Sequence, residues 1–358
     1  MVKDHWKKYK HTSLHSLIRR HTHECSCKST DFGENNNSGA SIKMQSQEER
    51  CHSMMHVSVA LCTYNGADFL AAQLDSISAQ SRLPYELVVC DDGSTDATLS
   101  ILENYAAHAP FPVQIHCNPT HLGACANFIK AIGLCSGNCV ALSDQDDVWQ
   151  PDKLFRALSM IQQVANPSSA LYCSRLQYVN TNLEPICLSP IPRVIGLTNA
   201  IVENIATGCS VVFGAEIQRL MLLGVPRDMI MHDWWAYLVA SVFGHVVYDP
   251  TPTVLYRQHG SNVTGREPKP LKIWNRTRWL VQRLLANNHG MDSLQQAEHF
   301  IATYTDIPQE SRMIVEELLR LRNAGVLIRM RYALRPRVER NDAIENFGLK
   351  AMLLMGWH

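Results

Sequence analysis

Residues 57–80 read VSVALCTYNGADFLAAQLDSISAQ, and this stretch changes its hydrophobic pattern halfway along. Residues 57–62 form an apolar, β-branched run that ends in a turn signal, as a buried strand does. Residues 67–80 carry apolar side chains at helical spacing. The pattern recurs in ELVVCDDGSTDATLSILENYA, residues 86–106, as an apolar run, a polar turn and a helical segment. The two stretches therefore predict consecutive strand–turn–helix units.

The same alternation continues for two more strands. VQIHC, residues 113–117, predicts a third strand, ACANFIKAIGLC, residues 124–135, a helix, and CVALS, residues 139–143, a fourth strand. Strands that alternate with helices indicate an α/β fold with a mostly parallel, Rossmann-like sheet flanked by helices on both faces. Ligands of such sheets bind beyond the carboxyl ends of the strands.

Three polar clusters fall at these carboxyl ends and are expected to line one cleft: TYN at residues 63–65, DDGS at 91–94 and DQDD at 144–147. Carboxylates packed closely repel each other unless protons or a cation neutralise them. Mg²⁺ or Mn²⁺ does so with oxygen ligands and completes its shell with phosphate oxygens. The third cluster therefore suits a metal–diphosphate site. The alternative is a solvated turn in which Asp147 or Asp152 caps the next helix.

The composition of all 358 residues narrows the expected binding partners and cellular location of the protein. Basic and acidic residues balance at 33 each, which gives no global charge for binding nucleic acid. No apolar run reaches the ~20 residues that span a bilayer, and the basic N-terminus lacks an apolar centre. Together with 12 scattered cysteines, this predicts a cytoplasmic protein. Residues 1–55 are polar and aperiodic, which predicts a disordered extension.

The second half of the chain is less regular. ALYCSR, CSVVFG and TVLYRQHGSN predict strands from residues 170, 209 and 253, and HDWWAYLVASVFG predicts a helix from residue 232. Residues 266–358 predict a helical, basic C-terminal extension, with helices over 268–288 and 309–334. A basic amphipathic helix can lie on an anionic bilayer, which indicates peripheral contact with the inner face of the cell membrane. The alternative is a helix that packs on the catalytic domain and exposes its arginines.

Three motifs together resemble one enzyme family. VSVALCTYNG with the helix after it, ELVVCDDGSTDAT and LSDQDDVWQPDKL are similar to the inverting family 2 glycosyltransferases with the GT-A fold. They are most similar to the bacterial branch that holds rhamnosyltransferases and other surface-polysaccharide enzymes. The resemblance covers about residues 55–265 and implies a GT-A catalytic domain over 56–265.

The resemblance also implies a reaction. The enzyme would move a sugar from a nucleotide-diphosphate sugar, with dTDP-rhamnose slightly favoured over a UDP-hexose, to a glycan or lipid-linked glycan. The transfer would invert the anomeric configuration and serve cell-surface polysaccharide or lipopolysaccharide synthesis. The cofactor would be Mn²⁺ or Mg²⁺.

Residue roles follow from matching positions of the family's motifs. The matches for binding the nucleotide sugar are Thr63, Tyr64, Asn65, Asp92, Gly123, Asn127, Asp144 and Arg257. Asp92 matches the acid that hydrogen-bonds the base. The matches for the metal are Asp144, Asp146 and His259, with Asp146 the expected direct ligand. A turn that merely shapes the backbone is the alternative for Thr63, Asn65 and Asp92.

The acceptor side is expected around MHDWW, residues 231–235. An inverting transfer needs a general base that takes the proton of the attacking hydroxyl, and the resemblance assigns this role to Asp233. The alternative role is a cap for the helix that follows. Gly208 would let the backbone approach the acceptor closely, and one of Trp234 and Trp235 would stack on a sugar while the other packs in the core.

Other classes are considered and set aside. A dinucleotide-binding dehydrogenase should show G-x-G-x-x-G after its first strand, where this chain has CTYNGAD. A haloacid-type phosphatase carries its Asp-x-Asp string after the first core strand, whereas here the string follows the fourth. A catalytically inactive sugar-binding scaffold would keep the fold, but the expected acids are all present.

Overall fold

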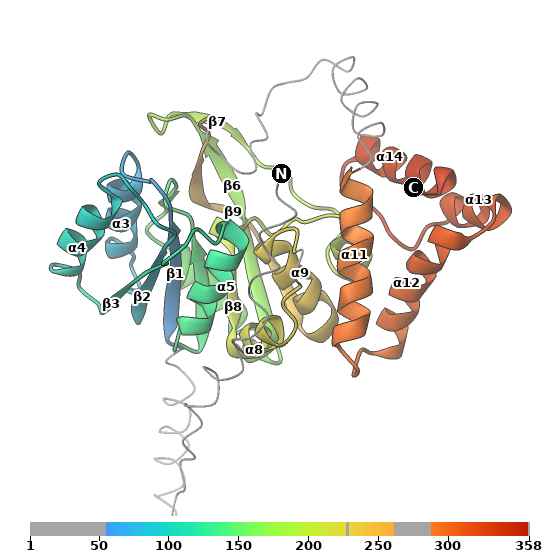
Figure 1. Cartoon of the computed structure of the whole chain (residues 1–358), viewed down its shortest axis with the longest axis horizontal. Helices are drawn as coiled ribbons and strands as arrows, with labels where there is room; N and C mark the ends of the chain where they lie inside the picture. The colour runs from blue at the N-terminus through green and yellow to red at the C-terminus, as the bar shows by residue number, and fades with distance from the viewer. Residues whose placement is uncertain (1–54, 227–228, 261–287, 357–358) are drawn as a thin grey trace, which may run out of the picture. The chain divides into compact units, whose positions relative to one another are not determined.

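A computed structural model of the protein describes residues 55–226, 229–260 and 288–356. These residues form a nine-stranded sheet with helices on both faces (Figure 1), which confirms the predicted α/β architecture. The predicted extension over 1–55, the domain boundary at 265 and the helix over 268–288 lie outside the described residues, except for Met55 and Asn288.

The first half of the sheet is parallel, as the alternating pattern predicts. Its strands lie in the order β3-β2-β1-β4, and Val59 of β1 pairs with Leu87 on one side and Ala141 on the other. The elements in chain order are β1 (Val57–Thr63), α3 (Leu70–Ser78), β2 (Glu86–Asp91), α4 (Thr98–Ala106), β3 (Val113–Cys117), α5 (Ala124–Leu134) and β4 (Cys139–Ser143).

The second half extends the sheet with mixed directions. The order continues β4-β8-β6-β9-β5, with β8 antiparallel to both of its neighbours, and β7 pairs with β6 off this path. The elements are β5 (Val148–Trp149), α6 (Lys153–Ile161), β6 (Ala170–Val179), β7 (Pro185–Leu188), α7 (Leu197–Ala200), β8 (Val212–Gly214), α8 (Ala215–Leu223), α9 (His232–Phe243) and β9 (His245–Arg257), with 3₁₀ turns η2 (Pro167–Ser169) and η3 (Gly208–Ser210).

Two apolar cores lie on the two faces of the sheet. Side chains of a strand point alternately to opposite faces, so Val59 and Leu61 of β1 join one core while Ala60 and Cys62 join the other. Strands β2 and β4 alternate in the same way. The strands are buried on both faces, which explains why their sequences are apolar runs without polar alternation.

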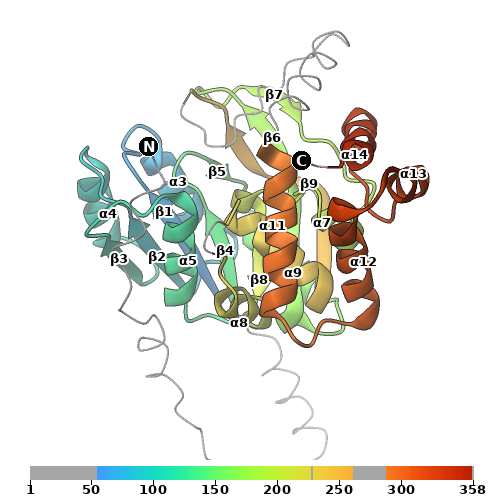
Figure 2. The same cartoon turned by 45° about the vertical axis from the view of Figure 1, so that its right-hand side comes forward.

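Four helices follow at the C-terminal end of the described chain: α11 (Asn288–Thr303), α12 (Gln309–Arg320), α13 (Val326–Leu334) and α14 (Ala343–Met355). They lie on the side of the fold away from β1, β2 and β3 in both views (Figures 1 and 2). The segment predicted to be helical over 309–334 is divided between α12 and α13, because a 3₁₀ turn at Leu321–Asn323 and the extended Gly325 separate the two helices. No helix among the described residues is long and apolar enough to cross a membrane.

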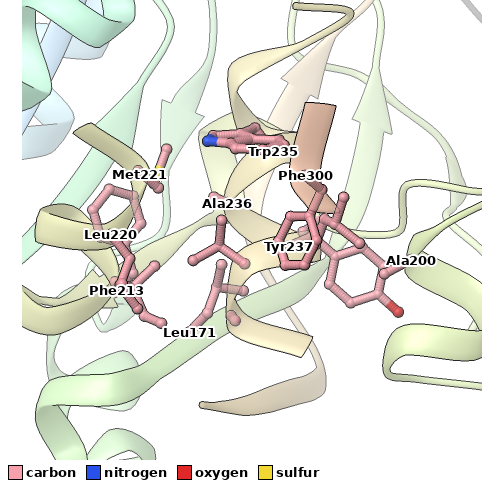
Figure 3. Close-up of a cluster of buried hydrophobic side chains, with 14 of the residues drawn as sticks. Leu171, Ala200, Phe213, Leu220, Met221, Trp235, Ala236, Tyr237 and Phe300 are labelled. Atoms are coloured by element: carbon pink, nitrogen blue, oxygen red, sulfur yellow. The ribbon is translucent and has the colours of Figure 1, made fainter. Parts of the chain in front are cut away.

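Helix α11 shares an apolar core with the sheet's own helices. Phe300 of α11 meets Trp235 of α9 edge to face, with ring centroids 5.7 Å apart (Figure 3). Tyr304, just after α11, donates its hydroxyl to the Leu220 carbonyl at 2.7 Å. Burial of such large aromatic side chains is a major stabilising term. The C-terminal helices are therefore packed onto the α/β domain through α9 and α8.

A glycine substitution tests the packing of the α9–β9 junction against η2. A Cβ at Gly244, between α9 and β9, would overlap the carbonyl oxygen of Ser169. We expect Gly244→Ala to lower the free energy of unfolding by about 1–3 kcal/mol through overpacking. The matched control is Gly133→Ala in α5, where the new methyl group would meet Leu222 at ordinary contact distance. That variant should gain about 0.5–1 kcal/mol, because alanine suits a helix interior better. Urea denaturation of both variants measures the difference, and equal stability would contradict the packing.

Candidate functional site

Carboxylates from the end of β4 gather with side chains from two later segments. Ligand atoms of Asp144, Asp147 and Cys209 lie within 4.8 Å of one another. Asp146 places Oδ2 2.7 Å from Nε2 of His259, which follows β9. The structure thus pairs two of the residues predicted to hold a metal, Asp146 and His259, and places the third, Asp144, with Asp147 and Cys209.

The end of β9 is fixed to this acidic segment by main-chain contacts. Arg257 donates its backbone N–H to Asp147 Oδ1 at 3.0 Å and its Nε–H to the Asp146 carbonyl at 2.8 Å. Its guanidinium also lies over the Phe69 ring, 4.7 Å from the centroid. Arg257 therefore positions the acidic turn. It does so in addition to its predicted role toward phosphate.

Asp147 does not cap the following helix. Asp152 is the N-cap residue of α6, and its side chain makes no capping hydrogen bond. Asp147 is fully buried, and its Oδ2 accepts no N–H or O–H hydrogen bond from the described residues. The Cys209 thiol, a weak donor, hydrogen-bonds the Asp147 side chain. A buried carboxylate with so weak a partner is costly, which favours a cation at this position.

The electrostatics of the cluster support the same conclusion. Burial, with the charges of Asp146 and Asp233 as further causes, raises the pKa of Asp144 to about 8. Burial and the charges of Asp146 and Asp144 likewise raise the pKa of Asp147. Carboxylates with raised pKa values gain from a nearby cation.

One buried lysine lies near these acids without neutralising them. Lys153 is fully buried, its Nζ makes no hydrogen bond to the described residues and lies 3.9 Å from the centre of the Trp149 ring. Burial lowers the pKa of Lys153 to about 7, although the charges of Cys209 and Asp147 act in the opposite direction. Burial therefore favours the uncharged form of Lys153, and this lysine is a weak counter-charge for the cluster.

The donor set fits a hard divalent cation. Carboxylate oxygens with one imidazole suit Mg²⁺ or Mn²⁺, and Asp144, Asp146 and His259 supply them. The Cys209 thiol does not suit such an ion, because burial raises its pKa and keeps it protonated. Cys209 is then a packing residue of the site, as its full burial also indicates.

The ends of β1 and β2 form the next part of the site. Thr63 donates its hydroxyl to Asp91 at 2.8 Å, and Asp91 also accepts the N–H groups of Gly93 and Ser94. Asn65 has a φ of 46°, and its side-chain oxygen accepts the Thr95 N–H at 2.8 Å. These contacts are turn chemistry, the alternative considered for Thr63 and Asn65, and they fix the backbone that precedes α3 and α4.

Asp92 organises the loop before α5. It accepts the N–H groups of Leu122 and Gly123 at 2.8 Å each and lies 3.0 Å from Nδ1 of His121. Gly123 has a φ of +84°, which favours glycine there. The carboxylate is already engaged by the protein, so a contact with a nucleotide base requires that His121 move or share it.

Two aromatic rings lie beside Asp92. Tyr64 is 47% exposed, and its ring centroid is 4.5 Å from that of His121. Asn127, by contrast, is buried: it donates to the Cys90 carbonyl and accepts from Asn118, both at 2.8 Å. Tyr64 therefore offers exposed ring surface, whereas the buried Asn127 supports the loop through its hydrogen bonds.

Asp233 lies in the first turn of α9 and is nearly fully buried. Its Oδ2 accepts the Gly208 N–H at 2.8 Å and its Oδ1 accepts the Trp234 N–H at 2.6 Å. Burial raises its pKa to about 6, although these hydrogen bonds lower it. A carboxylate oxygen keeps a second lone pair after one hydrogen bond, so Asp233 retains the capacity to accept a proton.

The turn η3 joins Asp233 to the acidic cluster. Gly208 holds the Asp233 carboxylate, and the next residue, Cys209, lies against Asp144 and Asp147. The charge of Asp233 also contributes to the raised pKa of Asp144, which requires proximity. Asp233 and Asp144 thus lie in the same region of the fold.

The two tryptophans of α9 have different environments. Trp235 is fully buried among the aromatic side chains of α11, so the structure does not place it at the site. Trp234 is partly buried and donates its indole N–H to the Ala200 carbonyl at 2.6 Å. Of the two residues predicted on the acceptor side, Trp234 is the one with exposed surface.

A cavity elsewhere in the described part of the fold lacks a cluster of carboxylates. A cavity of about 520 Å³ is lined by Thr198, Gln309, Glu310, Met313, Ile314 and Arg337. It carries one acidic and one basic side chain and lies among α7, α12 and the segment after α13. The cluster at the end of β4, with its three carboxylates, is therefore the functional-site candidate.

Comparisons with known proteins agree with the motifs. The sequence profile described as "Glycosyl transferase family 2" matches residues 58–184. The putative teichuronic acid biosynthesis glycosyltransferase TuaG of Bacillus subtilis is 33% identical over 238 residues, which are 66% of this chain and 90% of TuaG. The chain belongs to glycosyltransferase family 2.

A further relative within this family is the dTDP-rhamnosyl transferase RfbG of Shigella flexneri. It is 28% identical over 218 residues, which are 57% of this chain and 73% of RfbG. The chain spans 60% of the length of three uncharacterized mycobacterial relatives. Among solved structures, the mannosyltransferase PcManGT of Pyrobaculum calidifontis, in complex with GDP-Man and Mn²⁺, superimposes with a TM-score of 0.50. It is 18% identical, and the match covers 89% of this chain and 90% of PcManGT, so the likeness concerns the fold.

Several residues of this family 2 site escaped the sequence analysis. Gln145, between the two predicted metal ligands, exchanges hydrogen bonds with the Tyr64 backbone N–H and carbonyl at 2.8 and 3.0 Å. His121 pairs with Asp92. Position was the available signal: each lies within two residues of a predicted site residue.

Proposed function

We propose that the protein transfers a glycosyl group, with inversion, from a nucleoside-diphosphate sugar to a hydroxyl of a cell-surface glycan, using Mn²⁺ or Mg²⁺. The observation that carries the proposal is that a buried carboxylate, Asp233, is linked through η3 to the acidic cluster at the end of β4. A base on one side and a site for a cation and diphosphate on the other are the two parts that such a transfer needs.

Each residue takes a role from its place in the structure. Asp144, Asp146 and His259 would hold the cation, which supplies positive charge for the departing diphosphate. Tyr64 and the loop organised by Asp92 receive the nucleoside. Gly208 and the Trp234 N–H orient the Asp233 carboxylate. With a pKa near 6, Asp233 is largely ionised at pH 7 and takes the proton of the acceptor hydroxyl as that oxygen attacks the anomeric carbon.

The donor and acceptor classes rest on the relatives. RfbG is named a dTDP-rhamnosyl transferase and TuaG a putative teichuronic acid biosynthesis enzyme. The name of RfbG supports a donor carried on dTDP, with dTDP-rhamnose favoured over a UDP-hexose, and the name of TuaG supports a cell-surface polysaccharide as the product. The acceptor is a growing glycan, free or lipid-linked, and the reaction takes place in the cytoplasm.

Calorimetric titration with UDP, dTDP, GDP and CDP tests the proposal. Each nucleotide is measured with Mn²⁺ and again with EDTA. We expect one or two of them to bind in the presence of Mn²⁺, and affinity to fall at least about tenfold in EDTA, because carboxylates otherwise repel the diphosphate. A folded protein that binds none of the four would contradict the proposal and favour an inactive scaffold. Equal affinity in EDTA and in Mn²⁺ would show that nucleotide binding does not require a metal ion.

A further inference from the structure

Helices α13 and α14 expose an unusual amount of apolar surface. Leu327 and Leu334 are 81% and 79% exposed, and Phe347 of α14 is 68% exposed. Scattered apolar side chains on a surface need no explanation, but a group of them marks an interaction site. We name this group the α13–α14 patch; its members are Val326, Leu327, Ile328, Met330, Leu334, Phe347, Leu354 and Met355.

The exposed apolar side chains lie on different helix faces from the apolar side chains that pack into the core. At 100° per residue, Leu327, Met330 and Leu334 share one face of α13, whereas the buried Tyr332 lies on the opposite face and the buried Ala333 between the two faces. Helix α14 repeats the arrangement: Phe347 and Leu354 face outward, while Gly348, Leu349 and Leu353 are buried. Each helix thus has an inward apolar face that packs and an outward apolar face that lacks a cover among the described residues.

Positive charge accompanies the patch. Residues 321–356 contain seven basic and three acidic residues, and α13 itself has two arginines and no acid. Arg331 and the neighbouring Arg335 are exposed and form no ion pair with another described residue. Of the three acids, Asp342 caps α14 and Glu345 pairs with Arg340 at 3.7 Å. The arginines next to the patch are therefore not neutralised within their own segment.

We propose that the α13–α14 patch docks the protein on an anionic lipid bilayer. An apolar helix face flanked by arginines is the composition that lies in a bilayer interface, with apolar side chains among the acyl chains and arginines at the lipid phosphates. A second copy of the chain fits the surface less well. A two-fold contact pairs a surface with itself, and here it would bring Arg331 toward a positive surface with no acid on α13 to meet it.

The docking surface is separate from the sugar-transfer site. It uses none of the strand-end residues, and it lies on the side of the fold away from β1, β2 and β3 (Figures 1 and 2). The proposal does not rest on the proposed function. If the acceptor is lipid-linked, docking would hold the enzyme at the surface that carries the acceptor.

Vesicle co-sedimentation of the full-length protein tests the docking. The vesicles contain phosphatidylglycerol and phosphatidylcholine in equal parts, or phosphatidylcholine alone. We expect the protein to sediment with the anionic vesicles, and Leu327→Glu with Leu334→Glu to weaken this binding about tenfold or more. The matched control is Leu83→Glu with Leu223→Glu, which adds the same charge at two exposed leucines outside the patch and should bind like the wild type. All variants keep residues 261–287, so their differences isolate the patch.

A second pair of variants separates lipid charge from apolar contact. Arg331→Gln with Arg335→Gln should weaken binding to the anionic vesicles. The remaining binding should depend less on salt concentration than that of the wild type, because part of the charge contribution has been removed. The proposal is overturned if the wild type stays in solution, if the Leu327 and Leu334 variant binds as well as the control, or if light scattering shows a dimer that this variant alone dissociates. Nucleotide binding by each variant, measured in parallel, reports separately on the sugar-transfer site.

Discussion

Asp233→Asn should retain nucleotide binding and lose transfer by about 10²–10⁴-fold, the usual contribution of a general base. The amide has nearly the size of the carboxylate and can still accept one hydrogen bond, from Gly208 N–H or from Trp234 N–H. It has no oxygen that can take a proton at neutral pH. Initial rates of sugar transfer, with the donor identified by calorimetry, measure the loss.

The pH dependence of the wild type supplies an independent reading of the same residue. Burial raises the pKa of Asp233 to about 6, so transfer should be constant above that pH and fall as the pH drops through 6. Because the pKa is raised in the folded state, ionisation of Asp233 lowers the free energy of unfolding at high pH. Asp233→Asn should therefore be at least as stable as the wild type at pH 8. A variant that transfers at the normal rate would rule out Asp233 as the base.

The regular half of the fold was predictable because its strands are buried on both faces. The apolar runs of β1, β2 and β4 carry this burial in their composition. The sequence patterns in the second half of the domain predict its strands less clearly. Strand β5 has two residues and β8 three, which is too short for any period to show. Strand β9 contains Pro250 and Pro252, which argue against a strand, and its pairing with β6 shifts register next to them.

The site was predictable as far as strand ends determine it. Parallel strands bring their carboxyl ends to one edge, so Thr63, Asp92 and Asp144 were placed together from the order of the elements. Their partners depend on tertiary contacts. The pairing of Gln145 with the Tyr64 backbone joins the loops that follow β4 and β1, and the burial of Asp147 beside Cys209 depends on how η3 lies against β4. No local pattern encodes those approaches.

The prediction about the cation concerns Asp146. Asp146→Ala should abolish the Mn²⁺-dependent part of donor binding and lower transfer by about 10²–10³-fold, as loss of a charge-stabilising group does. Its Oδ2 faces His259 Nε2 at 2.7 Å, so the substitution removes one of the two side chains that meet there. The Asp146 carbonyl, which accepts from Arg257, is unchanged by the mutation. The fold of the acidic turn should therefore survive, and circular dichroism checks that it does.

The control for Asp146 is another acid of the same segment. Asp152 is exposed and lies 3.9 Å from Arg156, well outside the cluster of carboxylates. Asp152→Ala removes one negative charge as well, yet should keep both Mn²⁺-dependent binding and transfer. If Asp146→Ala bound the donor with Mn²⁺ as tightly as Asp152→Ala does, Asp146 would not be a ligand. The cation would then have to be assigned to Asp144 with Asp147, whose Oδ2 has no N–H or O–H donor among the described residues. Titration of Asp147→Asn, in which that oxygen loses its charge, distinguishes these two assignments.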